Sequence, residues 1–73
     1  MHERRIVMKR YVTEYANDLK LKMIQWLNDG VLSKELFLET TERFDTVISF
    51  CKRGLITNRE AVREIMEIFE GLT

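Results

Sequence analysis

The sequence predicts an all-α protein that forms one compact three-helix domain. The chain contains no proline and only three glycines, at positions 30, 54 and 71, which lie about a helix length apart. Between these glycines, apolar residues recur at the i, i+3, i+4 spacing of amphipathic helices. A length of 73 residues allows a single domain, over residues 1–73. We therefore expect helices over about residues 5–28, 34–53 and 58–70.

The first helix is predicted from one apolar stripe along residues 5–28. The segment RIVMKRYV within it also has the β-branched and aromatic content of a strand. A single strand would have no partner elsewhere in the chain, so a helix is the preferred interpretation. The stripe consists of Met8, Tyr11, Val12, Tyr15, Ala16, Leu19, Met23, Trp26 and Leu27.

The second and third helices are predicted from similar stripes, each opposite a charged face. We expect these stripes to form the core together with that of the first helix. In the second helix the stripe is Leu36, Phe37, Thr40, Phe44, Val47, Ile48 and Cys51. In the third helix it is Ala61, Val62, Ile65, Met66, Ile68 and Phe69, followed by Leu72.

Two short corners of similar composition separate the helices. Gly30 and Gly54 can adopt the left-handed conformation that ends a helix. Ser33 and Thr57 follow as N-caps, and Thr57 with Glu60 has the spacing of a capping box. Neither glycine-centred segment fits a calcium loop, because Leu36 replaces the last acidic ligand in the first and Arg53 stands in place of an acid in the second. The repeated pattern therefore predicts two capped corners, which place consecutive helices antiparallel or at a steep angle.

The composition argues against several classes of function. Twelve basic residues balance twelve acidic ones, which gives no overall attraction to nucleic acid or anionic membranes. The single cysteine, Cys51, is interpreted as a small buried hydrophobe in a reducing compartment. No zinc-ligand set, phosphate loop, catalytic triad or membrane span is evident. We expect a non-enzymatic cytoplasmic protein without cofactor, metal or small-molecule substrate, of a size that suits a bacterial or phage accessory factor.

Apolar residues that lie off the core stripes are candidate contacts with another protein. Helices that are apolar on two sides usually sit between neighbours, and a small domain gains stability from a second chain. The main functional prediction is therefore protein binding in a regulatory or accessory role, as a homodimer or by docking on a partner. The candidate interface residues are Leu21, Ile24, Leu38 and Phe50.

The alternative function is that of a small nucleic-acid-binding regulator. Residues 1–22 carry three more basic than acidic residues, and the second and third helices share the outline of a helix-turn-helix. Glutamates on the third helix would face phosphate, which makes protein binding the preferred function. The candidate nucleic-acid contacts are Arg4, Arg5, Lys9 and Arg10.

One segment resembles a known family. Residues 47–69, VISFCKRGLITNREAVREIMEIF, are similar to the SHOCT domain, a short helical hairpin with a glycine, an apolar–Ile–Thr turn and an acidic residue. The chain departs from the family pattern at Ala61, where an aromatic residue is typical, and lacks a lysine-rich second helix. The resemblance covers about a third of the chain. It implies a non-catalytic interaction or oligomerisation module, of a kind often appended to larger proteins.

Overall fold

The computed structural model describes the backbone of residues 2–72 and the side chains of residues 11–72. It consists of three helices, α1 (His2–Asn28), α2 (Lys34–Lys52) and α3 (Asn58–Glu70), and has no strand in the described part. The all-α prediction is confirmed, and α1 begins a few residues before the expected start. Residues of the segment RIVMKRYV are helical, so its alternative interpretation as a strand was wrong.

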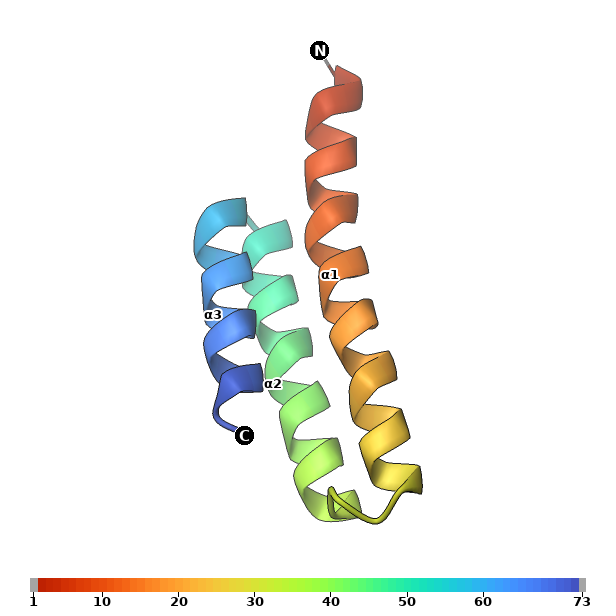
Figure 1. Ribbon diagram of the computed structural model, residues 1–73. Helices are drawn as coiled ribbons and strands as arrows, with labels where there is room; N and C mark the ends of the chain where they lie inside the picture. Colours follow the sequence, from red (N-terminus) through yellow and green to blue (C-terminus); the bar gives the residue numbers. More distant parts are fainter. Residues whose placement is uncertain (1, 73) are drawn as a thin grey trace.

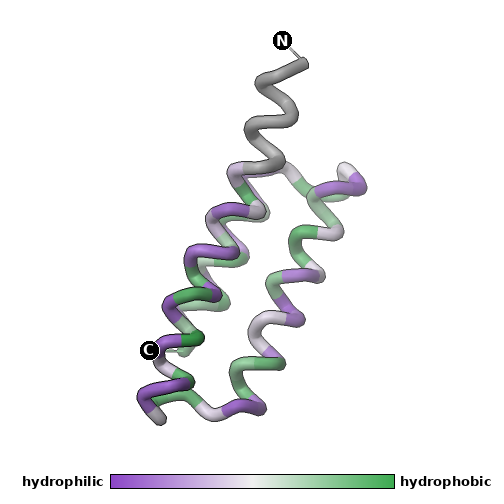
Figure 2. Tube along the Cα trace, turned by 90° about the vertical axis from the view of Figure 1, so that its right-hand side faces the viewer, coloured by the Kyte–Doolittle hydropathy of each residue, from purple (hydrophilic) through white to green (hydrophobic). Residues whose placement is uncertain are grey.

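The helices form an up-down-up bundle. Neighbouring helices in sequence run antiparallel, so α1 and α3 run in the same direction and α2 in the opposite one (Figure 1). In the view turned by 90°, α1 and α3 overlap on one side while α2 lies on the other (Figure 2). Each helix contacts both others. The three helices therefore pack as a triangle, with one groove between each pair.

Both corners have the same backbone structure. Gly30 and Gly54 each have a φ of 78°, and the following residue closes a Schellman motif. At the first corner the Val31 N–H donates to the Trp26 carbonyl over 2.9 Å, and at the second the Leu55 N–H donates to the Phe50 carbonyl over 2.9 Å. The resemblance between the two segments is thus a repeated way of ending one helix and starting another.

The predicted N-caps are confirmed at both corners. The Ser33 hydroxyl accepts from the Leu36 N–H over 3.1 Å. At the start of α3 the capping box is complete: the Thr57 hydroxyl accepts from the Glu60 N–H over 3.1 Å, and the Glu60 carboxylate accepts from the Thr57 N–H over 2.9 Å. These hydrogen bonds with Thr57 lower the pKa of the Glu60 carboxyl, so its contribution to stability is lost as the pH falls through that lowered pKa.

Replacing the capping threonine is expected to destabilise the protein modestly. Thr57→Ala removes the acceptor for the Glu60 N–H, which should reduce the free energy of unfolding by about 1 kcal/mol. Urea denaturation followed by circular dichroism measures this loss. The control is Thr46→Ala, because the Thr46 hydroxyl only donates to a carbonyl of its own helix. An equal loss in both variants would contradict the assigned role of Thr57.

The core follows most of the predicted stripes. Its buried apolar members are Val12, Ala16, Leu19, Met23, Leu32, Phe44, Val47, Cys51, Ala61 and Ile65. Leu32 comes from the first corner rather than from a helix, and the polar Thr40 is buried as well. Half-buried apolar side chains, including Trp26 and Phe69, pack around this centre. The core therefore extends into the corner that joins α1 to α2.

Three residues predicted for the core are instead exposed: Tyr11, Leu36 and Met66. Leu36 lies in the first turn of α2, next to the first corner. Helix α3 starts at the other corner and has only 13 residues, against 19 for α2, so it is too short to cover this turn. Tyr11 and Met66 lie at the edges of the stripes on α1 and α3, where a triangular bundle covers only part of a side chain. Met8 lies outside the part of the chain whose side chains are described.

Two side-chain contacts that the sequence did not predict fix the helices relative to one another. The Lys20 ammonium lies 2.9 Å from the Asp45 carboxylate, which pairs α1 with α2. The Cys51 thiol donates to the Asn58 amide oxygen over 3.1 Å and so connects the end of α2 with the start of α3. Cys51 is buried, as predicted. The first contact is partly solvated and contributes at most about 1 kcal/mol, and it shows which residues of α1 and α2 face each other.

Candidate protein-interaction surface

The four candidate interface residues all have exposed side chains. Leu21 is 64% exposed, Leu38 54%, and Ile24 and Phe50 41% each. Side chains of this size are often partly exposed singly in soluble proteins. What distinguishes an interface is therefore whether such residues lie together and beside a recess.

The structure separates these four residues into two groups. Lys20 and Asp45 face each other across α1 and α2. Ile24 lies one turn from Lys20, and Leu38 lies two turns from Asp45, both toward the first corner. These two residues therefore lie on the α1–α2 side, since residues four and seven apart share a helix face.

The other two residues lie elsewhere. Leu21 is on the outer face of α1, opposite buried residues such as Leu19 and Met23. Phe50 lies on the α2–α3 side, in a recess. The four residues thus do not form one surface.

The recess at Phe50 lies between α2 and α3, next to the second corner. We refer to it as the α2–α3 hollow. It has a volume of about 380 Å³ and is lined by Val47, Phe50, Ile56, Glu60, Arg63 and Glu64. Val47 is buried, Ile56 is half-buried and Phe50 is exposed. The hollow therefore has an apolar base that remains accessible to another molecule.

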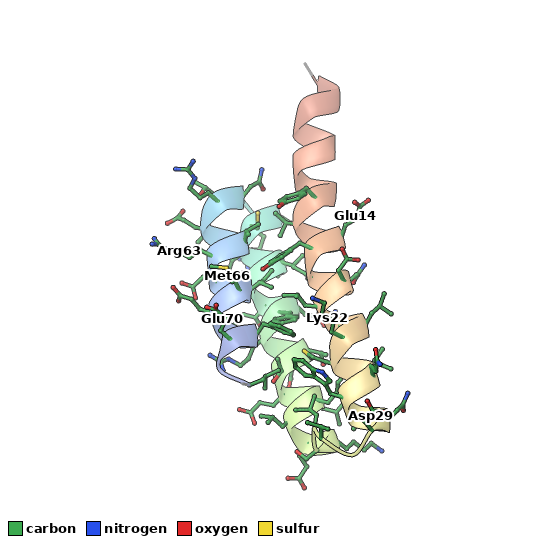
Figure 3. All side chains as sticks on the ribbon, in the orientation of Figure 1. Glu14, Lys22, Asp29, Arg63, Met66 and Glu70 are labelled. Atoms are coloured by element: carbon green, nitrogen blue, oxygen red, sulfur yellow. The ribbon has the colours of Figure 1, made fainter. Side chains whose placement is uncertain are left out.

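Charged side chains form the rim of the α2–α3 hollow. Glu60 and Glu64 are exposed carboxylates one turn apart on α3. Glu60 accepts hydrogen bonds from Thr57, which lower the pKa of its carboxyl. Arg63, which points away from the bundle in Figure 3, has its guanidinium 3.9 Å from the Glu67 carboxylate. The rim therefore has a net negative charge around an apolar centre.

A second apolar recess lies between α1 and α3. It has a volume of about 250 Å³ and is lined by Tyr11, Asn58, Arg59 and Val62. Along the same groove the rings of Tyr11 and Tyr15 stack with their centroids 6.5 Å apart, and the rings of Trp26 and Phe69 stack with their centroids 5.3 Å apart. Burial, and then the neighbouring Tyr11 and Glu70, raise the pKa of the Tyr15 hydroxyl.

Sequence reasoning missed this aromatic groove because its residues belong to the helical stripes. A stripe predicts which side of a helix faces its neighbours, but it does not predict how far the edge of the stripe is covered. The one available signal is the apolar stripe on α1, which includes the aromatic residues Tyr11, Tyr15 and Trp26. Tyr11 is 56% exposed, so this recess is open to solvent as well. The α2–α3 hollow is the larger of the two, at about 380 Å³ against about 250 Å³.

The candidate nucleic-acid contacts lie in the first turns of α1. The side chains of Arg4, Arg5, Lys9 and Arg10 fall outside the part of the chain whose side chains are described. Helices α2 and α3 lie side by side and antiparallel (Figure 1), whereas the paired helices of a helix-turn-helix cross at about 90–120°. The arrangement of α2 and α3 therefore gives this alternative no support.

We also searched the described residues for a metal site and for a membrane-spanning helix. Among residues 11–72, no group of three histidine, cysteine or acidic side chains is placed to hold a metal ion. No described helix is both long and apolar enough to cross a membrane. Comparison of the chain with protein-family models, curated proteins and solved structures found no significant match. The resemblance of residues 47–69 to the SHOCT domain stays a prediction that these comparisons neither confirm nor contradict.

Proposed function

We propose that this protein acts in a regulatory or accessory role by binding another protein chain at the α2–α3 hollow. The observation that carries the proposal is the exposed phenyl ring of Phe50 beside the apolar side chains of Val47 and Ile56. Aromatic side chains in apolar recesses with polar rims are typical of the centres of protein interfaces. The carboxylates of Glu60 and Glu64 would select a partner segment that is apolar and basic.

The backbone around the hollow supports this proposal because it is held rigidly. Ile56 lies between the Schellman motif at Gly54 and the capping box at Thr57. Phe50 lies on α2 one residue before Cys51, whose thiol is hydrogen-bonded to α3. A surface that is already ordered loses less conformational entropy when a partner binds. The hollow therefore combines accessible apolar area with little cost of ordering.

Photo-cross-linking in the native host tests the proposal. Phe50 is replaced by the photoreactive analogue benzoylphenylalanine, which preserves the aromatic ring, and the cells are irradiated. We expect covalent adducts to a protein, either a second copy or another chain. The control carries the same analogue at Val31, which is exposed at the opposite corner of the bundle.

The analogue at position 50 should give a much higher yield of protein adducts than the analogue at position 31. A folded protein that gives no protein adduct from position 50 would contradict the proposal. Equal yields from positions 50 and 31 would also contradict it, because they would show random collision rather than binding at the hollow. Circular dichroism on the purified variants establishes that both remain helical.

A further inference from the structure

Within residues 2–72, no other helix lies beside the N-terminal turns of α1. Because Lys20 faces Asp45, the last residue of α2, Lys52, lies at the level of about residue 13 of α1. Tyr11 lies beside Asn58, the first residue of α3. Residues 2–10 therefore extend past the second corner, as the ribbon in Figure 1 shows. We call residues 2–10 the N-terminal arm; at 1.5 Å per residue its helix is about 13 Å long.

The composition of the N-terminal arm matches the chemistry of the α2–α3 hollow. The arm contains the consecutive apolar residues Ile6, Val7 and Met8. Around them are four basic residues and one acid, Glu3. Helix α3, in contrast, carries four glutamates and two arginines. The arm is thus an apolar and basic segment, whereas the hollow has an apolar base and an acidic rim.

The lengths of the arm and the hollow also agree. Along α3 the hollow extends from the corner at Ile56 to Glu64. From Asn58 to Glu64 the helix rises about 9 Å, which is less than the length of the arm. An arm of this length can therefore cover the whole hollow.

We propose that the α2–α3 hollow of one copy receives the N-terminal arm of a second copy, in a symmetric dimer with exchanged arms. The inference rests on the proposed function and names the partner segment. The residues that line the hollow come from α2, α3 and the second corner and none from α1, so in the triangular bundle the hollow lies on the side away from α1. Two copies can meet end to end at their second corners through a two-fold axis that is perpendicular both to the bundle and to the direction from α1 to the hollow. In that arrangement each copy places its arm on the other's hollow. The symmetry closes the assembly at two chains.

An isolated chain leaves both the N-terminal arm and the α2–α3 hollow uncovered, and arm exchange would cover both. The arm projects beyond its own bundle, and Phe50 stays exposed in the hollow. Both lie at the same end of the molecule, next to the second corner. A second copy covers the two features in one contact, and small domains commonly gain stability from such association.

Charge reversal in the full-length protein tests the exchange. Sedimentation equilibrium should show a dimer of the unaltered protein. Glu64→Arg should weaken the dimer about tenfold, because it places like charge against the arm. Arg4→Glu with Arg5→Glu should weaken it similarly, and the three changes combined in one chain should restore most of the affinity. The control is Glu42→Arg, which makes the same change of charge at an exposed site on α2 outside the hollow.

The outcomes separate this inference from the proposed function. A dimer that is insensitive to Glu64→Arg, or that the combined variant does not restore, would overturn arm exchange. A protein that stays monomeric at millimolar concentration would overturn it too. In each case, photo-adducts from position 50 to a different protein would still support binding at the hollow.

The site of cross-linking gives an independent readout. A mixture of ¹⁴N- and ¹⁵N-labelled protein with benzoylphenylalanine at position 50 should give adducts between differently labelled chains. We expect these adducts on the tryptic peptide of residues 6–9, which lies in the arm. Adducts confined to residues 11–72 of the second copy would contradict the exchange of arms while still showing self-association.

Discussion

Phe44→Ala should lower the free energy of unfolding by about 3–5 kcal/mol. The Phe44 side chain is 0% exposed and is among the largest fully buried side chains of the core. Two of its fellow core members, Ala16 and Ala61, are themselves small and fully buried, so they cannot fill the space that a truncated phenylalanine leaves. The loss combines the transfer free energy of the ring with the cost of the cavity.

This loss is large for a chain of 73 residues. Stabilities of about 0.05–0.15 kcal/mol per residue give roughly 4–11 kcal/mol for the whole domain. The Phe44→Ala protein should therefore be largely unfolded at 37 °C if the total lies near the lower end. Urea denaturation and thermal melting, both followed by circular dichroism, measure the change.

Phe50→Ala is the matched control, because it removes the same ring from the same helix. Phe50 is 41% exposed, so the intrinsic loss should be much smaller than at Phe44. Both variants are measured over a dilution series, since association stabilises the folded state by mass action. Equal losses at the two positions under dilute conditions would contradict the assignment of Phe44 to the core.

Ile65→Asp should unfold the protein at 25 °C. Ile65 is 0% exposed on α3, so the variant loses a packed aliphatic side chain and buries a carboxylate. Truncation of such a side chain costs about 2–5 kcal/mol, and an unpaired buried charge adds several more. The sum is comparable with the entire stability of the domain. Circular dichroism at 222 nm should show the loss of helix directly.

The neighbouring Met66→Asp provides the control for Ile65→Asp. The two residues are adjacent in sequence and carry the same substitution, but Met66 is 41% exposed. Met66→Asp should therefore remain folded, with a moderate reduction in stability. The opposite order of stability would mean that α3 is rotated relative to the structure, with Met66 rather than Ile65 in the core.

Most of the secondary structure could be predicted because local interactions determine it. Gly54, Thr57 and Glu60 satisfy the backbone groups at one corner through hydrogen bonds between near neighbours. Such short-range patterns are visible in the sequence. The predicted bounds of α2 and α3 accordingly agree with the structure to within one residue.

The candidate site was predicted less completely. Phe50 was identified because it lies at the edge of its stripe, and the structure places it in a recess with Val47 and Ile56. Ile24 and Leu38 are exposed on another side of the bundle, with Leu21 on the outer face of α1. Helical periodicity gives the direction of each side chain from its own axis. It does not specify which side chains from different helices come together on one surface.

The amino-acid sequence by itself determined three amphipathic helices, the positions of both corners and the identity of their caps, because each depends on residues a few positions apart. The tertiary structure decided that Tyr11, Leu36 and Met66 are exposed and that α2 and α3 enclose a hollow at Phe50. These features depend on the relative lengths and packing of the helices. Buried contacts between residues far apart in the sequence, among them Val12, Phe44 and Ile65 in the core, set that packing.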